Sequence, residues 1–196
     1  MLRDSRIKIL VILFYFFVSV SFSQKNKIVF DENEIKINDS IIYSNGVLKN
    51  QCVKQFDKTF KTKNKSKRSI KGYSTTYFYK DIGLELYYSW KNKCNLDRIT
   101  VNLLINCPDC NLLYKDAKEF KNYTDVLYLL NIKISKDMTV ESLKKENILS
   151  NNFTQKTFKE KNYIEYSNER LKYIIYFNGN TDTSKILNIS VELYRL

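Results

Sequence analysis

The alternation of apolar and polar residues along the chain predicts many short strands. Near the start, three such segments follow one another: Lys27 to Phe30, Glu34 to Ile37 and Ser40 to Tyr43. The pairs Asn38-Asp39 and Asn45-Gly46 are typical of tight turns, because Asn, Asp and Gly tolerate the backbone conformations that such turns need. We therefore expect this part of the chain to begin the fold as strands joined by hairpin turns.

A helix and then an antiparallel meander are predicted next. Four residues at steps of four lie along one side of a helix that starts near Val47: Leu48, Cys52, Phe56 and Phe60. The segment from Lys58 to Lys71 is rich in Lys and almost free of apolar residues, which predicts an exposed loop. Three alternating segments then predict an antiparallel meander: Thr75 to Tyr79, Gly83 to Trp90 and Arg98 to Asn106.

The second half of the chain repeats this order. Asn131 to Ile134 resembles Glu34 to Ile37, and a helix with Thr139 as its N-cap is predicted from Thr139 to Asn147. Three more strands are expected: Tyr163 to Tyr166, Arg170 to Phe177 and Lys185 to Tyr194. The fold class is therefore α+β, dominated by antiparallel sheet, with two tandem units at about 27–110 and 125–196 that each pack one helix on a sheet. The alternative is that strands of similar pattern resemble each other without a true duplication.

The first residues are typical of an export signal. Arg3, Arg6 and Lys8 precede an apolar run from Ile9 to Val20, and Ser21-Phe22-Ser23 follows as a small-x-small cleavage site. The run is shorter than the roughly 20 residues that cross a bilayer. We expect a signal peptide at 1–23, a single β-rich domain at 24–196 that is periplasmic or secreted, and no transmembrane segment after cleavage. An uncleaved membrane anchor is the alternative.

Composition narrows the possible functions. The net charge of +12 indicates an anionic partner, while the chain has no His and four Gly. The lack of His excludes His-based nucleophilic catalysis, and the scarcity of Gly leaves no phosphate-binding loop or dinucleotide fingerprint. A hydrolase with paired carboxylates stays open, drawn from Asp81, Glu85, Asp97, Glu165 and Glu192. We assign no catalytic residue, metal or cofactor, and expect no nucleic-acid partner.

The cysteines carry the one candidate for chemistry. Cys107-Pro108-Asp109-Cys110 resembles the active-site motif of thioredoxin-like oxidoreductases, but Pro108 is the only proline and such folds need a second, cis proline. In an exported chain four Cys favour disulfides, and Cys107 with Cys110 plus Cys52 with Cys94 is the favoured of three connectivities. Dithiol catalysis by Cys107, and zinc held by four Cys, are the alternatives.

Two short motifs carry a resemblance to a known family. Asp31 to Lys36, Tyr79 to Leu84 and the repeated order of strand, helix and meander resemble an uncharacterised domain family of exported and immunity-like proteins of Bacteroidota. The junction from Ser21 to Gln24 is similar to signal peptides of that phylum. Two helix-on-sheet units in tandem are similar to the β-lactamase-inhibitor-protein architecture and to small envelope-assembly lipoproteins, whose concave sheets bind proteins. The resemblance implies no catalytic residue.

We therefore expect an exported, non-enzymatic binding or interaction module, inhibitor-like or envelope-associated, that recognises a protein or an anionic envelope component. Tyr and Trp are enriched at binding hot spots, which favours a binding face formed by Tyr77, Tyr79, Tyr88 and Trp90. Ordinary cross-strand packing is the alternative for these residues. The alternative function is a thiol-disulfide oxidoreductase that uses Cys107 and Cys110.

Overall fold

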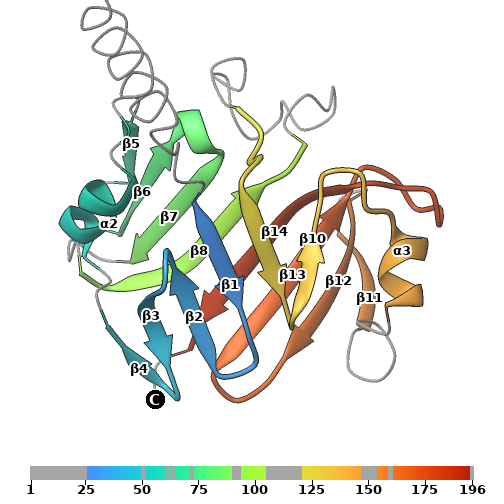
Figure 1. The fold of residues 1–196 in the computed structure, drawn as a ribbon, viewed down its shortest axis with the longest axis horizontal. Helices are drawn as coiled ribbons and strands as arrows, with labels where there is room; N and C mark the ends of the chain where they lie inside the picture. Colours follow the sequence, from blue (N-terminus) through green and yellow to red (C-terminus); the bar gives the residue numbers. More distant parts are fainter. Residues whose placement is uncertain are drawn as a thin grey trace, which may run out of the picture.

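Two β-sheets and two short α-helices form the part of the protein that the computed structural model describes (Figure 1). Described are residues 26–49, 52–60, 62, 65–70, 73–89, 94–104, 121–146, 154–158 and 161–194. The prediction of an α+β fold dominated by antiparallel sheet is confirmed. Three predictions fall outside the described residues: the signal peptide at 1–23, Trp90, and the pair Cys107 and Cys110.

The smaller sheet has six strands. Their spatial order is β10 (Ile132–Ile134), β9 (Val126–Leu129), β1 (Lys27–Phe30), β2 (Glu34–Ile37), β3 (Ser40–Ser44) and β4 (Val47–Leu48). β1 and β9 pair in parallel, with Ile28 beside Leu127 and Phe30 beside Leu129, and this contact joins the two halves of the chain. Neither β9 nor the parallel pairing was predicted.

Turn residues determine the hairpins of this sheet, as predicted. Asn38 and Asp39 have φ of 49° and 62°, and Asn45 and Gly46 have φ of 49° and 89°. Two consecutive residues with positive φ form the two-residue turn that matches the twist of paired strands. Because the second turn leads into β4, the prediction that a helix begins near Val47 is wrong. Helix α2 (Val53–Phe60) begins only after that strand has ended.

The larger sheet has eight antiparallel strands. Their order is β11 (Thr154–Phe158), β12 (Lys161–Ser167), β13 (Leu171–Phe177), β14 (Ile186–Leu193), β8 (Leu96–Asn102), β7 (Leu84–Ser89), β6 (Ser74–Tyr79) and β5 (Lys65–Ile70). The two predicted meanders are present, and β8 and β14 join them, with Val101 opposite Ile189. The prediction of an exposed loop from Lys58 to Lys71 is wrong in part. The segment Lys65–Ile70 is exposed, but it forms the edge strand β5 and not a loop.

The core lies between the two sheets, and the helices close it at either end (Figure 1). α2 contributes Phe56 and Phe60, and the Phe60 ring lies 5.4 Å from that of Tyr79. α3 (Val140–Lys145) contributes Leu143. The side chain of Thr139 accepts a hydrogen bond from the backbone N–H of Ser142, which confirms Thr139 as the N-cap. Neither of the two described α-helices has the length and the apolar content that a membrane span needs.

One glycine lies where a side chain cannot fit. Gly83 follows the short 3-10 helix η1 (Lys80–Ile82) with φ of 67°, and a Cβ there would lie 2.6 Å from both the carbonyl oxygen of Lys121 and the backbone N of Tyr123. We expect Gly83→Ala to lower the free energy of unfolding by about 2–4 kcal/mol, because left-handed strain and backbone overlap act together. Denaturant titration measures this loss.

A matched control is available at Gly179. A Cβ at Gly179 would meet only the side chain of Ser184, whose Oγ lies 2.8 Å away and can rotate. Gly179→Ala should therefore cost clearly less stability than Gly83→Ala. Equal losses in the two variants would show that the backbone contacts of Gly83 are not as described here.

Candidate binding surface on the eight-stranded sheet

The predicted binding face of tyrosines is directed into the core. Tyr77 is 5% exposed, and Tyr79 and Tyr88 are 0% exposed. The Tyr77 and Tyr88 rings pack edge to face, and Tyr79 donates a hydrogen bond to Asp57 at 2.8 Å. The prediction of an exposed binding face at these three tyrosines is therefore wrong, because their side chains point into the core between the two sheets. They act as the cross-strand packing residues of the alternative interpretation.

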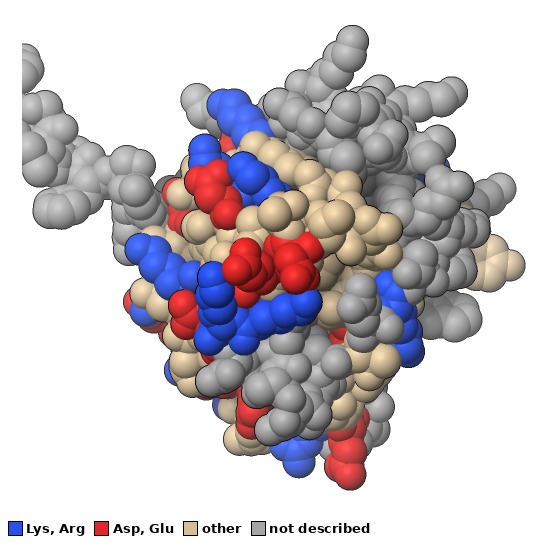
Figure 2. Space-filling view, turned by 90° about the vertical axis from the view of Figure 1, so that its right-hand side faces the viewer, with Lys and Arg blue, Asp and Glu red and all other residues tan. Residues whose placement is uncertain are grey.

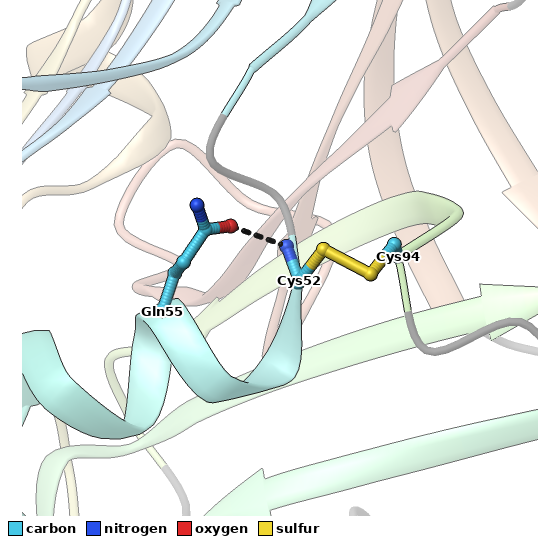
Figure 3. The surroundings of a disulfide bond; sticks show 3 residues. All are labelled: Cys52, Gln55 and Cys94. Atoms are coloured by element: carbon cyan, nitrogen blue, oxygen red, sulfur yellow. Dashed lines mark hydrogen bonds between the residues drawn. A yellow bond between two sulfur atoms is a disulfide. The ribbon is translucent and has the colours of Figure 1, made fainter.

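The cysteine pairing is confirmed for one of the two bridges. Cys52 and Cys94 form a disulfide with an S–S distance of 2.07 Å (Figure 3). Cys52 lies immediately before α2, and the side chain of Gln55 accepts a hydrogen bond from the Cys52 N–H at 2.9 Å. The bridge therefore fixes the start of α2 to the segment that leads into β8.

The face of the large sheet that points away from the small sheet carries a different set of residues, and we call it the outer face. One row of cross-strand neighbours on it runs through Tyr87, Arg98, Glu192 and Lys172, on β7, β8, β14 and β13. The Arg98 guanidinium lies 5.0 Å from the centroid of the Tyr87 ring and 3.8 Å from the Glu192 carboxylate. These contacts hold Arg98 between an aromatic ring and an anion.

Ion pairs extend this row to the edge of the sheet. Glu165 on β12 contacts Lys172 at 3.1 Å and also Lys156 on β11. The hydrogen bond from Lys156 lowers the pKa of the Glu165 carboxyl, and the hydrogen bond to Glu165 raises the pKa of Lys172. The outer face therefore presents charges of both signs in fixed positions.

A second row combines aromatic rings with an amide. Tyr163 and Tyr176 lie opposite each other on β12 and β13, with ring centroids 5.5 Å apart, and Asn188 on β14 lies beside Tyr176. Burial raises the pKa of Tyr176. The Oδ1 atom of Asn188 is buried and makes no hydrogen bond. A buried acceptor without a donor is uncommon in folded proteins and calls for an explanation.

Between the two rows lies a buried floor. Ile174, Ser190, Thr100 and Glu85 are neighbours across β13, β14, β8 and β7, and each is at most 9% exposed. Thr100 and Ser190 share a hydrogen bond of 2.8 Å, and Asn102 donates to Glu85 at 2.7 Å. The polar groups of the floor are thus hydrogen-bonded, Thr100 and Ser190 to each other and Glu85 to Asn102.

Paired carboxylates for hydrolysis are not formed by the glutamates of this face. Glu165 and Glu192 each contact a cation, and Glu85 accepts from Asn102. Asp97 accepts a hydrogen bond from the backbone N–H of Ser89. In the described part of the chain, no group of three or more His, Cys, Asp or Glu side chains could hold a metal ion.

An acidic hollow lies on the small sheet. Its volume is about 410 Å³, and it is lined by Asp31, Glu32, Asn33, Glu34, Ser44 and Asn45 at the turns that follow β1 and β3. Lys36 already pairs with Glu34, and Asn168 donates to the carbonyl oxygen of Glu32 at 3.1 Å. These contacts hold the turns together, and the lining of the hollow consists of carboxylates, amides and the hydroxyl of Ser44.

No family model, no curated protein and no solved structure matches this chain. The resemblance to exported domains of Bacteroidota therefore stays a prediction. The sequence did contain a signal for the outer face, because Tyr87 is out of phase with the core residues Leu84, Leu86 and Tyr88. Residues out of phase with the core lie on the opposite face of a strand. Arg98 and Tyr176 follow the same rule on β8 and β13.

Proposed function

We propose that the protein is a non-enzymatic binding module and that the outer face of its eight-stranded sheet binds a partner protein. The observation that carries the proposal is the row Tyr87, Arg98, Glu192 and Lys172. It crosses four strands and is flanked by the tilted ring pair of Tyr163 and Tyr176.

The chemistry of this row favours a protein over a uniform polyanion. Tyr and Arg are enriched at the residues that dominate protein interfaces, and a ring with few rotatable bonds loses little entropy on binding. Glu165 and Glu192 place negative charge beside the cations. A partner with charges of both signs complements such a surface, whereas a polyanion would be repelled by the two carboxylates.

The strands that carry this row support the same surface. The supporting strands are rigid, because each is paired on both sides within the sheet from β12 to β7. A rigid surface loses less conformational entropy when it binds.

The same proposal includes the location and origin of the domain. The Cys52–Cys94 disulfide is compatible with an oxidising compartment, which supports export to the periplasm or beyond. The order of hairpin, helix and four-stranded meander occurs in both halves and supports two tandem units, as in the inhibitor-like architecture. The oxidoreductase alternative has its own assay, namely reduction of insulin that is lost in a Cys107→Ser, Cys110→Ser variant.

Removal of the outer-face side chains should weaken partner binding while the fold remains. We expect the Arg98→Ala, Tyr176→Ala double variant to weaken binding at least about 30-fold, because truncation of a single hot-spot residue costs 2 kcal/mol or more. The partner is captured on the immobilised domain from native envelope extract, identified, and then titrated in purified form against each variant.

Lys133→Ala is the matched control, since Lys133 is exposed on β10 of the other sheet. Its affinity for the partner should equal that of the unmodified protein. If the double variant keeps full affinity while Lys133→Ala loses it, the binding surface lies on the small sheet and the proposal is wrong.

A further inference from the structure

The hairpin strands β5 and β6 lie at one edge of the large sheet (Figure 1). The two strands pair in register from Lys65 opposite Tyr79 to Ile70 opposite Ser74. The backbone N–H of Tyr73 donates to the carbonyl oxygen of Ile70 at 3.0 Å, which closes the turn. The positions of Ile70 and Tyr73 at its base are therefore set by the sheet.

Both residues of this turn are exposed although they are large and apolar. Ile70 is 60% exposed and Tyr73 is 71% exposed. In the described part of the chain, two other large hydrophobic residues are exposed, Val47 at 55% and Tyr194 at 39%, and they lie on other strands or ends. Single exposed apolar residues are ordinary, but two at the tip of one hairpin are a candidate contact surface.

The strand that leads to this tip is positively charged. β5 has the sequence KSKRSI, with three cations and no anion. Lys65 is bound to Asp57 at 2.7 Å and lies over the rings of Tyr77 and Tyr79, whereas Lys67 and Arg68 are exposed and form no ion pair with any described residue.

The opposite end of the molecule differs in charge. Figure 2 shows Lys and Arg beside Asp and Glu on that side, where Lys144 pairs with Asp182 and Lys145 with Glu141. The cations at the hairpin are thus available to an external anion, whereas those around α3 are neutralised by their neighbours.

We propose that the tip of the β5–β6 hairpin docks on an anionic lipid bilayer. Lys67 and Arg68 attract the negative headgroups, while Ile70 and Tyr73 enter the interface, where aromatic and aliphatic side chains gain from leaving water. A polysaccharide or a nucleic acid would bind the positive charges alone and leave the side chains of Ile70 and Tyr73 in water. The proposed partner surface crosses β7, β8, β14 and β13, whereas Ile70 and Tyr73 lie at the β5–β6 edge of the sheet. Arg68 lies on the outer face as well, because it is the cross-strand neighbour of Thr76, which in turn lies opposite Tyr87.

The test is co-sedimentation of the domain with lipid vesicles. Every described core residue lies between Ile28 and Leu193, so the protein that begins at Gln24 retains the whole core and lacks the apolar segment at 9–20. We expect it to bind phosphatidylglycerol-containing vesicles, not phosphatidylcholine vesicles, and to dissociate as salt rises.

Charge and tip variants separate the two contributions. Lys67→Gln, Arg68→Gln should lower the partition coefficient about 25-fold, since each basic residue near such a surface contributes about fivefold. Ile70→Ser, Tyr73→Ser keeps the charge and should lower it about tenfold. Val47→Ser, which removes an equally exposed apolar side chain from β4, should leave binding unchanged.

Three results would overturn the proposal. The first is a lack of binding to anionic vesicles at low salt. The second is a loss of vesicle binding in Val47→Ser as large as that in Ile70→Ser, Tyr73→Ser. The third is a loss of vesicle binding in Lys67→Gln, Arg68→Gln without any loss in Ile70→Ser, Tyr73→Ser. The last result would indicate general adsorption to polyanions. Thermal unfolding of each variant, expected to match the unmodified protein because the changed side chains are exposed, shows that the fold is retained.

Discussion

The protein should unfold cooperatively when the pH rises above about 10. Burial raises the pKa of four tyrosines well above their ordinary value: Tyr79, Tyr88, Tyr123 and Tyr173. In the unfolded chain these phenols ionise near pH 10. Stability that depends on their remaining protonated is thus fully present below pH 10 and is lost as the pH increases.

The size of this effect follows from proton linkage. A phenol that stays protonated in the folded protein while it ionises in the unfolded chain lowers the free energy of unfolding by about 1.4 kcal/mol per pH unit. Four such phenols together lower it by about 5 kcal/mol per pH unit. A domain with a typical stability of about 5–15 kcal/mol should therefore unfold within a few pH units above 10. Tyrosinate absorbance and circular dichroism, followed together, should change in one step.

Tyr88→Phe keeps the buried ring and removes one phenol. The slope of the free energy of unfolding against pH above pH 10 should therefore decrease by the contribution of about one proton. Tyr73→Phe is the control, because the Tyr73 side chain is 71% exposed rather than buried. Titration of all tyrosines near pH 10 without loss of structure would contradict the burial described for these side chains.

Loss of the Cys52–Cys94 disulfide should be the most damaging covalent change. The bridge closes a sequence separation of 42 residues, for which chain entropy gives a stabilisation of about 4 kcal/mol. The bridge also fixes the start of α2, whose residues Phe56 and Phe60 pack in the core. We expect Cys52→Ser, Cys94→Ser to lower the free energy of unfolding by about that amount in denaturant titration.

The comparison variant is Cys107→Ser, Cys110→Ser. A bridge between these two residues would close a far shorter loop, so its loss should cost less than the roughly 2–4 kcal/mol typical of disulfides. A larger loss of stability in this variant than in Cys52→Ser, Cys94→Ser would contradict the expectation that the Cys52–Cys94 bridge contributes more to stability than the other pair.

Local chemistry determined those parts of the fold that the sequence predicts well. Asn38-Asp39 and Asn45-Gly46 adopt the positive φ values that their side chains tolerate, so the first hairpins are placed correctly. Thr139 caps α3 because its hydroxyl meets the N–H of Ser142 three residues on. Such interactions involve neighbours in sequence and need no knowledge of the tertiary structure.

Other parts depend on contacts that are distant in sequence. The parallel pairing of β1 with β9 joins Ile28 to Leu127, and nothing local to either strand specifies it. β5 is a strand because β6 pairs with it, although its own composition is that of a loop. Lysines on an edge strand also discourage pairing with other chains, which gives that composition a structural role.

The candidate site shows the same limit. Tyr77, Phe78 and Tyr79 are all aromatic, so composition alone does not show which of them face the core. On β7 the phase is clearer, because Leu84 and Leu86 place Tyr88 inside and Tyr87 outside. Aromatic content led to the prediction of a binding face at Tyr77, Tyr79 and Tyr88, which are buried, whereas the alternation of core residues places Tyr87 on the opposite face.

The most direct test of the outer face as a binding surface is site-directed photocrosslinking. A photoreactive phenylalanine analogue is placed at Tyr87 or Tyr176 on the outer face, and at Lys133 on the small sheet as the control. After irradiation in native envelope extract, we predict that one partner protein is crosslinked from Tyr87 and from Tyr176 and not from Lys133. Crosslinking of that partner from Lys133 alone would contradict the account.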